Sequence, residues 1–198
     1  MAPLKFLEQR YPLIDSNFRT FCGAHGIFSG GFRGGHLTEL VGPSSSGKTQ
    51  VCLLIATNVA KSSGKVMFLD TSNSFSPKRV AEFVNQTSDH STRKVKRTLE
   101  HIMSNIVCYS VFDIFTMFDV IHELRSTLRS LGVKLLIIDS ISSLIAPVLG
   151  GSGAHGHALM VSAGLMLKQL ADEHDLPVLI GNQSYGSWRR KQSETRTW

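Results

Sequence analysis

The chain is 198 residues long, which fits one domain with a sizeable core. An apolar fraction of 42% beside 18% charged residues is ordinary for a globular protein and argues against a disordered chain. The formal net charge of +6 is compatible with a nucleic-acid partner. Scattered cysteines argue against a disulfide framework or a zinc site. No apolar run approaches the ~20 residues of a membrane helix, so we expect no membrane partner.

Short apolar runs alternate with helical-period segments along most of the chain. The predicted strands occupy residues 36–41, 65–70, 106–109, 133–139 and 177–181. The predicted helices cover residues 48–61, a segment that opens at Pro77, and residues 112–128 and 156–173. The strand at 133–139 is almost continuously apolar, as expected of a strand that is buried on both faces. The alternation predicts an α/β fold with a mainly parallel sheet flanked by helices.

Two terminal regions fall outside this pattern. Residues 1–29 contain a short helical stretch, and residues 185–198 are polar and basic. We therefore predict three parts in the chain: an N-terminal helical segment, a core over residues 30–184 that carries the chemistry, and a basic C-terminal tail.

A glycine- and serine-rich segment follows the first predicted strand and fits the pattern G-x-x-x-x-G-K-[ST]. Its residues are Gly42, Pro43, Ser44, Ser45, Ser46, Gly47, Lys48 and Thr49. Backbone N–H groups of such a loop surround the β-phosphate, the lysine reaches the β- and γ-phosphates, and the threonine hydroxyl faces Mg²⁺. The segment predicts binding of a nucleoside triphosphate, with ATP as the expected ligand. The alternative is a serine-rich turn without a ligand.

A carboxylate ends the predicted strand 133–139. Asp139 follows four aliphatic residues, at the edge of the sheet where ligands of open α/β sheets bind. We expect Asp139 and Thr49 to hold Mg²⁺, the aspartate through water. The alternative is a structural aspartate that begins a turn. The neighbouring glycine-rich segment favours the metal site.

Five segments carry a resemblance to a known family. They read HLTELVG, GKTQVCL, FDIFTMFDVIHELR, APVLGG and LADEHDLPVLIGNQ, at residues 36–42, 47–53, 112–125, 146–151 and 170–183. Over about residues 30–183 the chain resembles the RecA-like recombinase family, in particular its eukaryotic branch and the delta-type paralogues within that branch.

The resemblance implies a P-loop NTPase core of the RecA-like type. It also implies a nuclear ATP-binding protein of homologous-recombination DNA repair, which acts in a hetero-oligomer with other paralogues on single-stranded or branched DNA. Gln183, which closes the matching segment before the family's second DNA-binding loop, becomes a candidate nucleotide-binding residue. Family members extend further in both directions, so we expect a core that is incomplete at both ends, as in a truncated or splice form.

Two departures from the family concern its chemistry. The strand-exchange recombinases have a glutamate that activates the attacking water where this chain has Ser72. A serine hydroxyl is too weakly basic for that role, so we expect Lys48 to stabilise phosphate without fast hydrolysis, unless another carboxylate substitutes. The first DNA-binding loop would fall near residues 149–157, where His155 and His157 are the only basic side chains. We expect a mobile surface loop there with weak DNA contacts, and no metal pair.

Two basic segments lie elsewhere in the chain. Arg189, Arg190 and Lys191 follow Trp188, and such a mixture of aromatic and cationic residues suits single-stranded DNA. The alternative is a disordered basic tail. Residues 93–97 contain four cations and fit either a nuclear localisation signal or the solvated face of a helix.

Several functions therefore stay open. The chain fits an ATP-binding recombinase paralogue with weak or DNA-stimulated hydrolysis. It also fits an interaction subunit whose bound nucleotide fixes a partner interface, without ATPase or DNA-binding activity of its own. A P-loop small-molecule kinase is less consistent with the sequence, because no lid segment with clustered arginines is present. An unstable isoform without independent activity is the remaining alternative. Ser72 in place of glutamate is the feature that separates an active ATPase from an interaction subunit.

Overall fold

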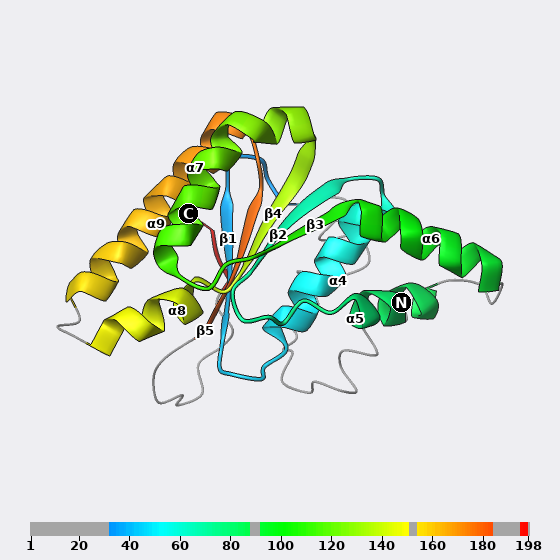
Figure 1. Cartoon of the computed structure of the whole chain (residues 1–198), viewed down its shortest axis with the longest axis horizontal. Helices are drawn as coiled ribbons and strands as arrows, with labels where there is room; N and C mark the ends of the chain where they lie inside the picture. The colour runs from blue at the N-terminus through cyan, green and yellow to red at the C-terminus, as the bar shows by residue number, and fades with distance from the viewer. Residues whose placement is uncertain (1–31, 88–91, 151–153, 184–194, 198) are drawn as a thin grey trace.

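The computed structural model describes residues 32–87, 92–150, 154–183 and 195–197 and contains one sheet with helices on both faces (Figure 1). The described strands are β1 (Leu37–Gly42), β2 (Lys65–Asp70), β3 (Ile106–Ser110), β4 (Val133–Asp139), β5 (Val178–Gln183) and β6 (Thr195–Thr197). Their order in the sheet is β3-β2-β4-β5-β1-β6. Strands β1 to β5 run parallel, and β6 pairs antiparallel with β1. The predicted α/β fold with a mainly parallel sheet is confirmed.

The helices form two layers, one on each face of the sheet. One layer contains α4 (Lys48–Lys61), α5 (Pro77–Thr87) and α6 (Thr92–Ser104). The other contains α7 (Ile114–Leu131), α8 (Ile141–Ile145), the short 3-10 helix η1 (Ala146–Gly150) and α9 (Ala154–His174). Figure 1 shows α6 and α9 at opposite ends of the longest axis of the molecule.

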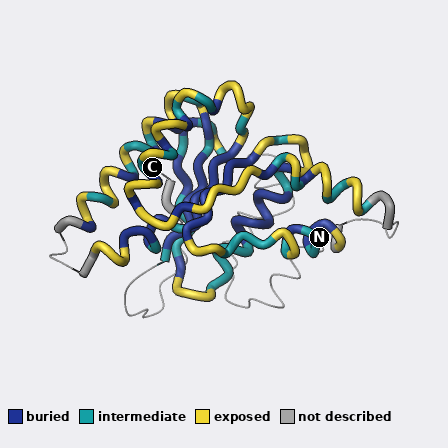
Figure 2. Tube along the Cα trace, in the orientation of Figure 1, coloured by how far each residue is buried: buried dark blue, intermediate teal, exposed yellow. Residues whose placement is uncertain are grey.

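Alternating side chains of the central strands fill a separate core on each face. Phe68 and Ile137 pack with the α4 layer, whereas Leu69 and Ile138 pack with the α7 layer. All four side chains are fully buried, and the strands form the dark centre of Figure 2. Because successive residues of a strand point to opposite faces, a strand covered on both sides is apolar at every position. This explains the continuous apolar run in β4.

The predicted strands and helices are present, with small shifts at their ends, and two helices are additional. Helix α6 separates α5 from β3, and α8 follows directly after β4. Helix α7 has well-formed ends: the Asp113 carboxylate accepts hydrogen bonds from the backbone N–H groups of Phe115 and Thr116, at 3.0 and 2.8 Å. Gly132, with a φ of 66°, ends the same helix in the left-handed conformation.

The expectation of a mobile loop at residues 149–157 was wrong for the described part of that region. Both His155 and His157 belong to α9. Nearby glycines favoured a loop, but α9 buries Ala163 and Leu167 in the core that it shares with α7, and such packing outweighs weak local helix propensity. Within the described ranges, no cluster of three or more potential metal ligands occurs.

The C-terminal region contains a strand that the sequence analysis did not predict. Residues 195–197 form β6, which pairs with residues 38–40 of β1. The candidate DNA-binding residues Arg189, Arg190 and Lys191 lie outside the described residues, as do residues 1–29.

Candidate nucleotide-binding site

A tight loop joins β1 to α4 at the carboxyl end of the parallel strands. Gly47 precedes α4 with a φ of 93°, a left-handed conformation that favours glycine. Ser45 also has a positive φ, of 60°, and the Ser46 N–H donates to the Pro43 carbonyl at 3.3 Å. No side chain caps the start of α4, so the first N–H groups of this helix face the loop. Such an arrangement suits an anion.

The ammonium of Lys48 lies within this loop. Its Nζ donates hydrogen bonds to the carbonyls of Gly42 and Pro43, at 3.0 and 2.7 Å, and to Ser46 Oγ at 3.4 Å. Burial lowers the pKa of Lys48, and the nearby charge of Asp139 raises it in part. An anion bound in the loop would therefore meet a cation that is already partly removed from water.

Asp139 ends β4 next to the loop and is only 4% exposed. The Thr49 side chain lies near the carboxylate of Asp139. Among the described residues, the Oδ2 atom of Asp139 is buried without any hydrogen-bond partner. Burial raises the pKa of Asp139, the Thr49 side chain lowers it, and the charge of Asp70 raises it further. A buried carboxylate oxygen without a partner costs stability, and it marks a position where a cation would be bound.

Asp70 ends the neighbouring strand β2, and both oxygens of its carboxylate accept hydrogen bonds from the loop that follows. Oδ1 accepts from the backbone N–H groups of Ser72 and Ser74, at 3.2 and 3.0 Å, and from Ser74 Oγ at 3.3 Å. Oδ2 accepts from the Phe75 N–H at 2.8 Å. Asp70 thus shapes the loop that carries Ser72, while Ser72 itself is exposed.

A polar link joins the end of β5 to the start of α8 and to the middle of β1. The Asn182 side chain accepts from the Ser142 N–H at 3.1 Å and donates to Glu39 Oε1 at 2.6 Å. The Gln183 N–H donates to Ser142 Oγ at 2.9 Å. Gln183 is also the strand partner of Gly42, so it lies beside the start of the loop. The link fixes the end of β5 relative to α8, which begins two residues after Asp139.

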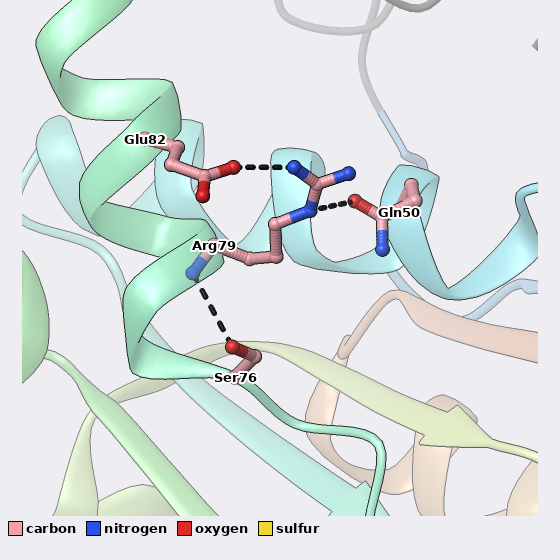
Figure 3. A network of polar contacts seen from close by, with 4 residues as sticks. All are labelled: Gln50, Ser76, Arg79 and Glu82. Carbon is pink, nitrogen blue, oxygen red and sulfur yellow. Dashed lines mark hydrogen bonds and ion pairs between the residues drawn. The ribbon is translucent and has the colours of Figure 1, made fainter. Parts of the chain in front are cut away.

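Helix α5 is attached to α4 by a second network, shown in Figure 3. Arg79 Nε donates to Gln50 Oε1 at 2.8 Å, and the same guanidinium forms an ion pair with Glu82. The Arg79 N–H also donates to Ser76 Oγ at 3.3 Å. Because Gln50 follows Thr49 directly, this network holds α5 against the first turn of α4.

The structure brings most of the predicted site residues to one edge of the sheet. The loop at 42–49, Asp139 and Gln183 lie together there, and Ser72 follows the adjacent strand.

Sequence reasoning missed several residues that hold this edge in shape. They are Asp70, Arg79, Ser142, Gly181 and Asn182. A Cβ atom at Gly181 would lie 2.8 Å from Asp139 Oδ1, so only glycine fits beside the carboxylate. The one signal in the sequence was the position of Asp70 at the end of an apolar strand, which resembles that of Asp139.

Comparison with known proteins gives the family of this chain. A sequence model of the Rad51 family matches residues 22–193. The chain belongs to the Rad51 family. It is 34% identical over 182 residues to DNA repair protein RAD51 homolog 4 of Mus musculus, covering 87% of this chain and 54% of that relative.

Two further relatives extend this comparison of the Rad51-family chain. The probable DNA repair protein RAD51 homolog 4 of Dictyostelium discoideum is 27% identical over 205 residues, with 85% of this chain and 58% of the relative covered. DNA repair protein RAD51 homolog 2 of Mus musculus is 27% identical over 179 residues, with 83% and 49% covered. The chain therefore spans about half the length of the curated relatives that it matches.

Membership of the Rad51 family implies nucleotide binding and a place among DNA repair proteins. In the part of the chain that the structure describes, no helix has the length and apolar character needed to cross a bilayer.

Proposed function

We propose that the loop at residues 42–49 binds ATP. The observation that carries the proposal is the pair of groups at its centre: the partly buried ammonium of Lys48, and the buried carboxylate of Asp139 with an oxygen that lacks a partner. The free N–H groups at the start of α4 supply further donors for phosphate oxygens. Gln183, beside Gly42, completes the candidate set.

The residues at this edge also fit Mg²⁺. Thr49 lowers the pKa of Asp139, so its hydroxyl lies near the carboxylate that would face the metal. They supply too few ligands for a metal site built from protein alone, which is usual for Mg²⁺ bound together with substrate phosphates. When bound there, Mg²⁺ would neutralise charge on the phosphate oxygens. Thr49 and Asp139 would fix its position.

We further propose that hydrolysis by this chain is slow. Phosphoryl transfer depends on positioning, on charge stabilisation and on a group that orients water. Lys48 supplies the charge, and Thr49 and Asp139 the metal site. At the end of β2, Ser72 is exposed and offers only a hydroxyl, while the neighbouring carboxylate of Asp70 is engaged by backbone N–H groups.

The broader role that we propose is that of an ATP-binding subunit in homologous-recombination DNA repair. The relatives are DNA repair proteins by name, which supports a role in DNA repair. Other Rad51-family paralogues are the proposed partners, in a hetero-oligomer that acts on single-stranded or branched DNA in the nucleus. An interaction subunit without its own ATPase activity is the second candidate, and the hydroxyl at position 72 favours it.

Equilibrium titration with a fluorescent ATP analogue tests the nucleotide site. Lys48→Ala removes a charge-assisted contact of about 1.5–3 kcal/mol, so the affinity should fall roughly ten- to a hundredfold. Lys65→Ala is the matched control, because Lys65 is exposed at the opposite end of β2. Equal affinity of the parent and Lys48→Ala would refute the assignment of the loop.

A further inference from the structure

Helix α6 presents a basic outer surface. It packs on the core through Ile102, which is fully buried, with Val95 and Leu99 beside it. Lys96 and Arg97 are exposed on the solvent side of the same helix. Basic residues therefore face solvent along a helix that apolar contacts hold in place, and the surface does not depend on a flexible segment.

The basic surface continues from α6 onto the turn between α4 and β2. His101 Nε2 and Ser63 Oγ are joined by a hydrogen bond of 3.2 Å, which places the end of α6 against this turn. Lys61 precedes the turn and Lys65 follows it, and both are exposed. We call Lys65, Lys96 and Arg97, with His101 at the end of the helix, the α6 strip.

The two described helices that carry these residues contain few acidic side chains. Glu100 is the only acidic residue in α6, and α4 contains none. Arg93 and Lys94 precede the strip in the same helix, so four of the thirteen residues of α6 are Lys or Arg. Lys96 and Arg97 are consecutive in this helix, and both are exposed. A cationic surface of this kind suits a polymer with regularly spaced negative charges.

The distribution of Lys and Arg along the chain also favours α6 as the surface for a polyanion. No Lys or Arg occurs between Lys134 and Lys168, the region that includes η1 and the start of α9. Phosphate contacts come mainly from Lys and Arg and supply most of the non-specific affinity for nucleic acids. In Figure 1, α6 lies at the other end of the molecule from α8 and α9.

We propose that the α6 strip binds the sugar–phosphate backbone of a nucleic acid without sequence preference. The inference rests on the nucleic-acid part of the proposed function and gives it a surface. It does not require ATP binding, so the two proposals can fail separately. The contact is electrostatic, and its strength falls steeply as the salt concentration rises.

Fluorescence anisotropy tests whether the α6 strip binds nucleic acid. A labelled single-stranded oligonucleotide is titrated with the full chain at about 50 mM salt. The double substitution Lys96→Glu and Arg97→Glu should weaken binding roughly 10- to 100-fold and reduce the slope of log K against log salt by about 1–2. The neutral pair Lys96→Gln and Arg97→Gln should have an intermediate effect. It also avoids a like-charge pair between positions 96 and 100.

The matched control is Arg33→Glu with Arg129→Glu, which changes the net charge equally. Both residues are exposed and lie outside α6 and its neighbouring turn. The affinity of this control for the oligonucleotide should lie within about twofold of that of the unsubstituted chain at the same salt concentration. Only charges close to the polymer contribute to the salt dependence of binding.

Three outcomes would overturn the proposal. In the first, the parent shows no binding at this salt, or the α6 variants bind like the parent. In the second, the control loses as much affinity as the α6 variants, so that only net charge matters. In the third, an acidic peptide of equal charge displaces the oligonucleotide equally well, so that the strip recognises acidic proteins.

A parallel ATP titration of each variant shows whether the nucleotide site has failed as well. Substitution of Arg189, Arg190 and Lys191 by Ala separates the tail from the strip and leaves β6 in place.

Discussion

Two neighbouring parallel strands, β2 and β4, both end in a buried aspartate, yet the two carboxylates differ in what they contact. Asp70 and Asp139 are register partners and are 2% and 4% exposed. Asp70 accepts three backbone N–H groups and one hydroxyl. Asp139 has one oxygen with no partner among the described residues. Position and burial are therefore the same in the two aspartates, and the unsatisfied acceptor is what distinguishes the candidate ligand site.

The difference has an energetic meaning. The hydrogen bonds to Asp70 offset the cost of burying its charge, and they stabilise the loop after β2. Asp139 carries a desolvation cost that the Thr49 hydroxyl and the Lys48 ammonium only partly offset. A cation bound there would recover that cost, so ligand binding and stability are linked at Asp139 and not at Asp70.

The largest expected effect is on hydrolysis at the end of β2. Ser72→Glu supplies a base that can orient and deprotonate water, a contribution that is typically 10²–10⁴-fold in rate. The ATP affinity should change little. Single-turnover hydrolysis with DNA present measures the rate of the parent and the variant.

The control for this prediction is Ser72→Gln, which has a similar shape and no basic group. It should hydrolyse ATP at the rate of the parent. A parent that already turns over at about 1 s⁻¹ or faster would mean that another residue, or a partner, supplies the base.

The next effect is a loss of stability at Asp70. Asp70→Asn replaces one acceptor oxygen by a donor and breaks one or two hydrogen bonds to a charged group. We expect the free energy of unfolding to fall by roughly 2–4 kcal/mol, at about 1.5–3 kcal/mol per bond. Chemical denaturation without nucleotide measures it.

Asp119→Asn is the control for Asp70→Asn, because Asp119 is exposed on α7. Its effect should stay within about 0.5 kcal/mol. If both variants were equally stable, the hydrogen bonds to Asp70 would not be what holds the loop after β2.

The smallest effect is expected at Asp139, where substitution should raise or preserve stability, in contrast to the loss expected at Asp70. Its pKa is raised in the folded state, so the folded state binds the proton more tightly than the unfolded state. The contribution of Asp139 to stability without ligand should therefore fall as the pH rises from the usual carboxyl pKa through the raised one, and stay low above it. Asp139→Asn should remove this decline and be as stable as the parent, or more stable, at neutral pH. Thermal melts across the acidic range compare the two slopes; a parent whose stability changes with pH just as that of Asp139→Asn does contradicts the assigned shift.

The local sequence pattern was sufficient to predict much of the fold and the centre of the candidate site. The loop at 42–49 is specified by residue types at fixed spacing, and β4 by its unbroken apolar run. Neither depends on distant contacts, so the sequence analysis found both.

The parts that were not predicted depend on tertiary contacts. The role of Asp70 depends on how residues 72–75 turn back toward it, and Asn182 meets Glu39 and Ser142 only after β5 has paired with β1. Helix α9 starts in a glycine-rich segment because its later residues pack on α7. A pattern within one segment carries no record of these contacts.

The most direct test of the account is a thermal melt with and without ATP and Mg²⁺, on the parent and on Asp139→Asn. Ligand at about 100 times Kd adds about 2.7 kcal/mol to the folded state, which for a chain of this size raises Tm by about 5–10 °C. We predict that the parent shows this rise only when ATP and Mg²⁺ are both present, and that Asp139→Asn loses most of the part that depends on Mg²⁺. No rise in the parent, or an equal rise in both proteins, would contradict the assignment of Asp139 to the nucleotide site.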